Sequence, residues 1–351
     1  TYYSAGTSSE WAPHFPIFTS NDLQTWHHAG YAFKEKPKWT LSSFWAPELF
    51  YRNGLFYLYY TAKRASDSIS CLGVATSSDP AKGFTDHGVL LAHGKEAIDA
   101  FVIEDENKLF VTYKAYGLDQ RPIELLGAEL SSDGLKVIGE PFSLLQDTAR
   151  KGLEGQCIIK NNGYFYLFYS VGGCCGIDCS YAIEVARSKS LKGPYVKSPN
   201  NPLLSETQNW KCPGHGTIVN TGNNDWYYMF HAYNKKDDVY TGRQGLLGKM
   251  EWEGEWPVLL PGTDAPQPIT KKDSDFQWQW DFRHGIAKIN SKKENICFEA
   301  EADNNPTGTV VTVRPYSGDY TMSVKVEKRG TGLRGVAIYG DANAAVGVGL
   351  R

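Results

Sequence analysis

The sequence has no excess of positive charge, no long apolar run and little helical periodicity. Its 36 lysines and arginines are offset by 39 aspartates and glutamates, which leaves a formal net charge of −3. This balance argues against a nucleic acid or an anionic membrane surface as the partner. No stretch approaches the roughly 20 consecutive apolar residues that a membrane-spanning helix requires. The remaining class is a globular chain built mainly from β-strands.

Asparagine-linked glycosylation signals are absent, and the seven cysteines are unevenly spread. The missing N-x-[ST] pattern favours a bacterial origin over a eukaryotic secretory one. Cys174, Cys175 and Cys179 lie together in GGCCGIDC, without a neighbouring histidine or a zinc-like spacing. A local disulfide that involves Cys212 is the preferred interpretation, and a metal site and free thiols are the alternatives. Disulfides would fit a periplasmic or extracellular bacterial protein.

Aromatic residues, by contrast, are abundant and recur at a nearly constant interval. The chain holds 21 tyrosines, 16 phenylalanines and 10 tryptophans, which favour β-structure and sugar-stacking surfaces. The aromatic-rich strands are TYYSAG (1–6), FYLYYTA (56–62), LFVTYKA (109–115), YFYLFYS (164–170) and WYYMFHA (226–232). Aligning Tyr3, Leu58, Val111, Leu167 and Met229 gives spacings of 55, 53, 56 and 62 residues. This period predicts a five-bladed β-propeller, in which neighbouring blades complete each other's cores.

Chemically active side chains recur at one position before these strands. Trp45, Asp99, Glu154 and His215 each lie 12 to 14 residues upstream of the aligned residue of their own repeat. The first strand of a propeller blade is innermost, so equivalent positions converge at one mouth of the central channel. An aromatic ring, two carboxylates and an imidazole would then form a site. The alternative is that they are ordinary polar residues at strand starts.

The blade pattern ends near residue 262. PGTDAPQP (261–268) has the composition of a linker, and WQWDF (278–282) and several alternating strands follow it. We therefore expect a five-bladed propeller over residues 1–262. Residues 263–351 would form the N-terminal part of a C-terminal β-sandwich.

The same stretches resemble glycoside hydrolase family 43, a family of inverting enzymes on a five-bladed propeller. The resemblance is carried by FWAPELFYRNGLFYLYYTA (44–62), AIDAFVIEDENKLFVTY (97–113), LEGQCIIKNNGYFYLFYS (153–170), GHGTIVNTGNNDWYYMFHAY (214–233) and GRQGLLGKMEWEGEWPV (242–258). The WQW at 278–280 is similar to the opening of the concanavalin-like sandwich in β-xylosidase-type members.

The resemblance implies a role for each residue of the candidate site. Glu154 matches the general acid, and Asp99 matches the carboxylate that tunes the pKa of the acid and orients the substrate. His215 matches an axial histidine that in some members approaches a calcium ion or a water cluster; no cofactor is required. Arg243 matches an arginine that contacts the sugar, and Trp45 an aromatic residue near the sugar subsite. A structural salt bridge for Arg243 and simple packing for Trp45 are the alternatives.

Three further aromatic residues are candidates for contact with the sugar. Phe101 follows Asp99 by two positions, so strand alternation would place both on the same side. Trp11, in EWAPHFPIF (10–18), and Phe44 are candidates for lining the pocket, with packing at its rim as the alternative.

The family's general base has no match within the numbered chain. It is an aspartate on the innermost strand of the first blade, and the repeat offset from Tyr3 places it before Thr1. We therefore expect the base upstream of the numbered chain, because a propeller without that strand would expose an unpaired edge.

Inverting glycosidases need one protonated carboxyl group to assist the leaving oxygen and one carboxylate to activate water, roughly 6.5–9.5 Å apart. Glu154 should therefore have a raised pKa, through the neighbouring Asp99 carboxylate and a dry aromatic pocket. Arg243 would keep Asp99 ionised. The expected activity is exo-acting release of a terminal pentose, L-arabinofuranose or D-xylose, from plant oligosaccharides. A catalytically inactive carbohydrate-binding propeller is the main alternative, and a protein-binding scaffold is a weaker one.

Overall fold

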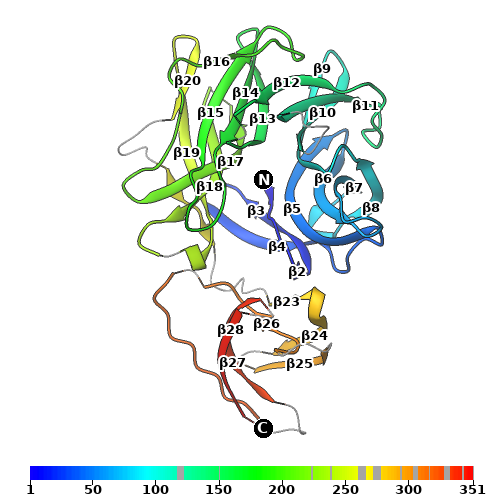
Figure 1. Ribbon diagram of the computed structural model, residues 1–351, viewed down its shortest axis with the longest axis vertical. Coiled ribbons are helices and arrows are strands. Elements are labelled where there is room, and N and C mark those ends of the chain that lie inside the picture. The colour runs from blue at the N-terminus through cyan, green and yellow to red at the C-terminus, as the bar shows by residue number, and fades with distance from the viewer. Residues whose placement is uncertain are drawn as a thin grey trace. The chain divides into compact units, whose positions relative to one another are not determined.

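The computed structural model describes the chain except for residues 117–121, 150, 223, 238, 260–265, 272–277, 293–294, 303–306, 316, 328–332, 342–343 and 351. It confirms the all-β class (Figure 1). Helical structure in the described residues is limited to short 3₁₀ segments: η1 (Pro80–Lys82), η2 (Val239–Thr241) and η5 (Phe282–His284). None of the described helices has the length and apolar character needed to cross a bilayer. The chain divides into two compact units, Thr1–Ser9 with Pro13–Asp275, and Glu10–Ala12 with Phe276–Arg351.

The first unit consists of successive groups of antiparallel strands, which Figure 1 shows following one another around the unit. The first group contains β1 (Tyr2–Ala5), β3 (His14–Ser20), β4 (Thr25–Phe33) and, parallel to β4, β22 (Thr270–Lys271). The second contains β5 (Thr40–Arg52), β6 (Leu55–Arg64), β7 (Ser70–Ser77) and β8 (Thr85–Leu91). The third contains β9 (Glu96–Asp105), β10 (Lys108–Tyr116), β11 (Ile123–Leu130) and β12 (Phe142–Asp147).

Two more groups complete this unit. One contains β13 (Leu153–Asn161), β14 (Tyr164–Val171), β15 (Ala182–Ser188) and β16 (Val196–Lys197). The other contains β17 (Trp210–Asn220), β18 (Trp226–Asn234), β19 (Gln244–Glu253), β20 (Trp256–Leu259) and β21 (Gln267–Pro268). The first strands of successive groups contact one another: β5 with β9, β9 with β13, and β13 with β17. Equivalent positions on these strands are therefore brought together.

The second and third groups are not separate sheets. A parallel pairing of Ser70 in β7 with Glu96 in β9 joins them into one eight-stranded sheet. The division of the unit into five blades therefore stays a prediction.

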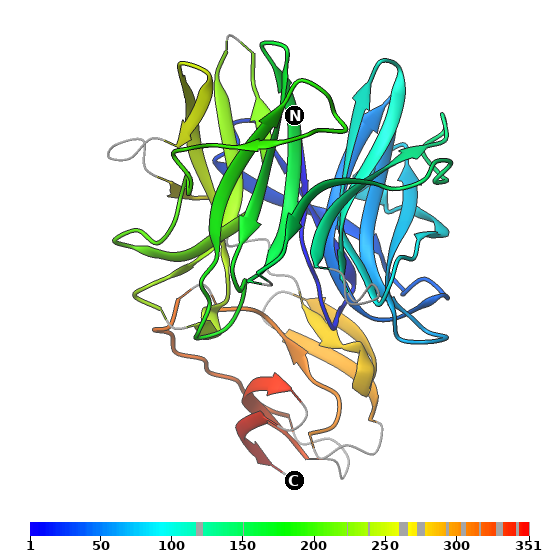
Figure 2. The same cartoon turned by 45° about the horizontal axis from the view of Figure 1, so that its top comes forward.

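Hydrophobic cores form between neighbouring groups, as the repeat period predicts. Tyr59 of β6 shares a core with Val111 of β10, and Phe168 of β14 shares another with Tyr228 of β18. All four side chains are fully buried. Figure 2 shows these groups of strands standing side by side. Each group is too small to bury its own apolar faces, so burial against its neighbours supplies most of the stabilisation.

The second unit is built from short antiparallel pairings. β2 (Trp11–Ala12) pairs with β23 (Gln279–Asp281), which pairs with β26 (Val311–Thr312). β24 (Gly285–Lys292) pairs with β25 (Asn295–Ala302), and β27 (Arg334–Asp341) with β28 (Ala344–Leu350). The predicted boundary at residue 262 lies outside the described residues, and the β-sandwich stays a prediction.

Candidate active site

Each of the four inner strands β5, β9, β13 and β17 carries a β-bulge near its start, marked by a shift of register against the next strand. A residue in the left-handed conformation lies in each bulge: Ala46 (φ 46°), Asp99 (φ 59°), Gly155 (φ 60°) and His215 (φ 45°). Left-handed backbone is costly for residues other than glycine and is often found at functional sites. Because a bulge re-aims side chains, these repeated bulges position the candidate site.

The bulges divide the predicted site residues into two classes. Trp45 and Glu154 pair with Thr61 and Ser170 of the adjacent strands, immediately before the left-handed residue. Asp99 and His215 are themselves the left-handed residues. The sequence register predicts that the four residues are equivalent. In the structure, Asp99 and His215 are instead offset by one position from Trp45 and Glu154.

The structure nevertheless brings the acidic and imidazole groups together. Asp99, only 5% exposed, accepts a hydrogen bond at Oδ2 from the backbone N–H of Gly155 at 3.0 Å. The same oxygen lies 3.6 Å from Nδ1 of His215. Since Gly155 directly follows Glu154, the carboxylate of Asp99 is anchored beside the candidate acid.

Two glycines make this close approach possible. A Cβ on Gly155 would lie 2.8 Å from Cγ of His215, and the backbone there has a positive φ. A Cβ on Gly214 would lie 2.1 Å from the Tyr181 ring. Neither position can accept a larger residue without moving a side chain of the site.

Glu154 has two side-chain partners that sequence reasoning missed. Its Oε2 lies 2.7 Å from Nζ of Lys114, and its Oε1 accepts a hydrogen bond at 3.0 Å from the hydroxyl of Tyr181. Lys114 also pairs with Oε1 of Glu96 at 3.1 Å. Tyr181 is 2% exposed. The candidate acid is thus held from two sides.

Lys114 occupies a position that repeats in the aromatic strands. Thr61, Lys114, Ser170 and His231 each lie opposite the start of a bulge. Thr61 Oγ1 accepts the Asp99 N–H at 3.2 Å, and Ser170 Oγ accepts the His215 N–H at 2.8 Å. At three of these positions the polar residue therefore ties its group to the inner strand of the next group. The signal in the sequence that points to Lys114 is the recurrence of one polar residue at this position of each aromatic run.

The ionisation of the two carboxyl groups differs from the sequence-based expectation. Burial by itself would raise the pKa of Glu154, but the Lys114 ammonium, together with His215 and the Tyr181 hydroxyl, holds that pKa below its usual value. Burial raises the pKa of Asp99, and the nearby Glu154 adds to this effect. The expectation that Glu154 has a raised pKa in the free protein is therefore wrong, because the Lys114 ammonium favours the ionised form of its carboxyl group.

Arg243 lies beside the histidines of the site. Its Nη1 is 3.1 Å from Nε2 of His231, whose ring is parallel to that of Tyr181 with centroids 6.1 Å apart. The His231 and His215 rings are 6.3 Å apart. Arg243 is thus close to the site, but the raised pKa of Asp99 does not support the expectation that Arg243 keeps this aspartate ionised.

The predicted aromatic residues have different environments. Trp45 is partly buried on β5, opposite Thr61. Phe44 is fully buried, stacked on His14 with centroids 3.9 Å apart, and so belongs to the core rather than to a pocket lining. Phe101 is partly buried and packs against two hydrophobic cores. The bulge at Asp99 interrupts the strand alternation that was expected to place Phe101 and Asp99 on the same side. Trp11 is in the second unit, where its ring packs edge-on against Tyr339.

The residues around His215 offer little for the calcium ion that the resemblance implies. Ca²⁺ takes six to eight oxygen ligands. In the described part of the chain, no group of three or more histidine, cysteine, aspartate or glutamate side chains is placed to hold a metal. The calcium ion stays a prediction, and no step below depends on it. The predicted general base precedes Thr1 and stays a prediction.

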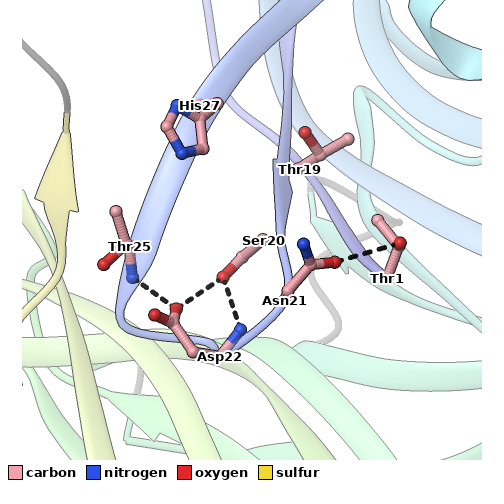
Figure 3. A pocket seen from close by; sticks show the side chains of 7 residues that line it. All are labelled: Thr1, Thr19, Ser20, Asn21, Asp22, Thr25 and His27. Atoms are coloured by element: carbon pink, nitrogen blue, oxygen red, sulfur yellow. Dashed lines mark hydrogen bonds between the residues drawn. The ribbon is translucent and has the colours of Figure 1, made fainter.

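A hollow in the first unit lies elsewhere and is lined by Thr1, Thr19, Ser20, Asn21, Asp22, Thr25 and His27 (Figure 3). Asp22 Oδ1 there accepts hydrogen bonds from the hydroxyl of Ser20 and the backbone N–H groups of Gln24 and Thr25. Asp22 therefore stabilises the turn between β3 and β4, and none of the predicted site residues lines the hollow.

Two disulfides confirm the preferred interpretation of the cysteines. Cys179 is bonded to Cys212, and the neighbours Cys174 and Cys175 are bonded to each other. Cys179 and Cys212 pack with Tyr181, the residue that donates to Glu154. The bridge therefore tethers the segment before β15 to the start of β17.

Replacing both Cys179 and Cys212 by serine is expected to lower the free energy of unfolding by about 3 kcal/mol, because the bridge closes a long loop. Catalytic activity should fall as well, since Tyr181 loses part of its support. Denaturant unfolding of the double variant measures the first effect, with Cys297→Ser, an exposed free cysteine, as the control. Equal stability of the double variant and the control would contradict this role.

Comparison with known proteins agrees with this geometry. The family model for glycosyl hydrolases family 43 matches residues 1–257. The beta-xylosidase of Bacillus subtilis (strain 168) is 26% identical over 338 residues, covering 86% of this chain and 62% of that protein. The extracellular endo-alpha-(1->5)-L-arabinanase 1 of that organism is 27% identical over 279 residues, covering 73% of this chain and 83% of that protein.

A solved structure supports the same assignment. The crystal structure of the GH43 BlXynB protein from Bacillus licheniformis matches with a TM-score of 0.67 and 25% identity, covering 80% of this chain and 60% of that chain. The chain thus spans less than two thirds of this protein and of the Bacillus subtilis beta-xylosidase. The matched residues contain the inner strands and the carboxylates Asp99 and Glu154. This chain belongs to family 43 of the glycosyl hydrolases.

Proposed function

We propose that the protein is an inverting, exo-acting glycosidase that releases a terminal pentose, L-arabinofuranose or D-xylose, from oligosaccharides. The observation that carries the proposal is the anchoring of Asp99 beside Glu154 at neighbouring bulges of β9 and β13. Glu154 would give its proton to the glycosidic oxygen. Asp99 and His215 would orient the sugar, and a base upstream of Thr1 would activate water.

Trp45 and Arg243 would bind the sugar in this scheme. A tryptophan ring gives the apolar face of a sugar a surface to lie against, and a guanidinium donates to its hydroxyl groups. The two disulfides, together with the extracellular label of the arabinanase relative, support an exported, periplasmic or extracellular protein.

The proposal is tested with the full-length protein on 4-nitrophenyl α-L-arabinofuranoside, 4-nitrophenyl β-D-xylopyranoside, linear arabinan and xylo-oligosaccharides. Monosaccharide as the sole early product supports exo action, whereas mixed arabino-oligosaccharides would show the endo action for which one relative is named. Proton NMR of the first anomer released tests inversion. Sugar binding without turnover would instead establish the inactive carbohydrate-binding alternative.

Asp99→Asn is expected to reduce kcat/KM by about 100-fold and to change the pH profile, because misplacing the acid or the substrate slightly has effects of this size. The variant removes a charge that faces His215 and weakens the acceptor of the Gly155 N–H. Asp105→Asn is the matched control, because Asp105 lies on the same strand and pairs with the surface residue Lys160. Identical kinetics for the two variants would rule out a role for Asp99 in the site.

A further inference from the structure

Lys114 has no place in the roles that the family resemblance implies, yet it makes the shortest contact with Glu154. Its Nζ lies 2.7 Å from Oε2 of Glu154 and 3.1 Å from Oε1 of Glu96. The Lys114 side chain is 12% exposed, and those of Glu96 and Glu154 are 26% and 18% exposed. One ammonium group therefore bridges two carboxylates in a largely buried setting.

The position of Lys114 explains why this residue reaches the acid. At the equivalent positions of two neighbouring groups, the short side chains of Thr61 and Ser170 accept hydrogen bonds from the backbone of the next inner strand. Lysine is longer and charged, so it reaches past the backbone to the side chain of Glu154. Electrostatic attraction at this distance is strong where water is largely excluded.

We propose that Lys114 and Glu96 are positioning residues that hold the Glu154 carboxyl group and control how readily it gives its proton to the leaving oxygen. Lys114 favours the ionised form of Glu154, and Glu96 offsets part of that influence by sharing the ammonium charge. The inference rests on the proposed function, in which Glu154 is the proton donor.

The proton balance of the reaction shows why such control matters. As the bond between the anomeric carbon and the leaving oxygen breaks, Glu154 gives its proton to that oxygen and becomes a carboxylate. The base takes a proton from the attacking water, and Lys114 stays protonated throughout. A cation beside the newly formed carboxylate makes Glu154 a stronger acid, but it also reduces the fraction of protein that carries the proton.

Other groups also face Glu154, and they remain in place when Lys114 or Glu96 is changed. Asp99 on β9 and His215 on β17 act on it electrostatically, and Tyr181 donates a hydrogen bond to it. The ring of His231, with Arg243 beside it, has its centroid 6.1 Å from that of Tyr181 and 6.3 Å from that of His215. A single substitution in the pair Lys114–Glu96 therefore reports on that pair.

The test compares the pH dependence of kcat/KM for Lys114→Met and Glu96→Gln on an aryl pentoside. Removing the ammonium should move the alkaline limb to higher pH, because Glu154 then keeps its proton longer. Removing Glu96 should move it to lower pH, because Lys114 then acts on Glu154 alone. At the alkaline pH at which kcat/KM of the wild type has fallen to about a tenth of its plateau value, we expect kcat/KM of Lys114→Met to be about half of its own plateau value.

The leaving group supplies a second readout. Without Lys114, Glu154 becomes a weaker acid, so the plateau rate on xylo- or arabino-oligosaccharides should fall several-fold, whereas the rate on nitrophenyl glycosides should change little. Lys114→Arg should keep the wild-type limb. Lys160→Met is the matched control, because Lys160 is on the same strand as Glu154 and pairs with Asp105 at the surface.

An unmoved limb in Lys114→Met, or limbs that move in the same direction in both variants, would overturn the inference. If Lys114→Met does not fold, Lys114→Gln and the infrared titration of the Glu154 carboxyl group, obtained by difference against Glu154→Gln, give the same test without turnover. The proposed function fails separately. The proposed function would be contradicted if Glu154→Gln lost activity equally on activated and unactivated substrates, or if the wild type hydrolysed neither class of substrate.

Discussion

Glu154→Gln is expected to lose about 100- to 10,000-fold in kcat on arabino- or xylo-oligosaccharides, the range that general acid catalysis typically contributes. Glutamine keeps the shape of the side chain and can accept a hydrogen bond from Tyr181 or Lys114, but it has no acidic proton. Nitrophenolate needs little protonation to leave, so the loss on nitrophenyl glycosides should be much smaller. Steady-state kinetics on the two substrate classes measure this difference.

The control for this experiment is Glu129→Gln. Glu129 on β11 also pairs with a lysine, Lys108, but this ion pair lies at the surface, away from the bulges. The substitution should leave kcat unchanged on both substrate classes. A Glu154→Gln variant that loses the same factor on both classes would count against proton donation, because the defect would then be structural.

The period of the repeat and the meeting of Asp99 with Glu154 were predictable from the sequence. Both follow from one rule: a unit of similar length, repeated along the chain, returns the same position to the same place. The rule depends only on the length of each unit, so counting residues along the sequence is enough to apply it. It also identifies Glu154 and Asp99 as neighbours although they are 55 positions apart in the sequence.

The orientation of these side chains could not be predicted in the same way. The bulges place Asp99 and His215 in a left-handed conformation that the sequence does not mark, because only Gly155 at an equivalent position is a residue that favours it. Nothing in the sequence therefore indicates that the repeat offset differs by one residue between these strands. In a strand, one residue decides which side a group faces.

The charge state of Glu154 depends on contacts that are distant in sequence. Lys114 and Tyr181 lie 40 and 27 residues from it, on either side. The repeat does contain a signal, since FYLYYTA, LFVTYKA, YFYLFYS and WYYMFHA each place one polar residue near the end of an aromatic run. Only a comparison of these four positions would show that the lysine is exceptional.

A second large effect is expected in the stability of the first unit, which should fall steeply in acid because of His14. This histidine on β3 is 1% exposed and stacks on Phe44. Burial, together with the positive charge of Lys36, lowers the pKa of His14 from 6.5 to about 3. The unfolded chain therefore binds a proton below about pH 6.5 that the folded chain does not bind until about pH 3.

The sign of the effect follows from this difference. Stability contributed by neutral His14 is complete above about pH 6.5 and is lost as the pH falls toward 3, at about 1.4 kcal/mol per pH unit. By about pH 5 the loss should be roughly 2 kcal/mol. Urea unfolding at several pH values measures it, and His14→Gln should flatten the profile in this window. His27→Gln, at an exposed histidine on the neighbouring strand β4, should keep the wild-type slope. If His14→Gln keeps that slope too, another buried group must account for the acid sensitivity, because a side chain that cannot titrate contributes no proton linkage.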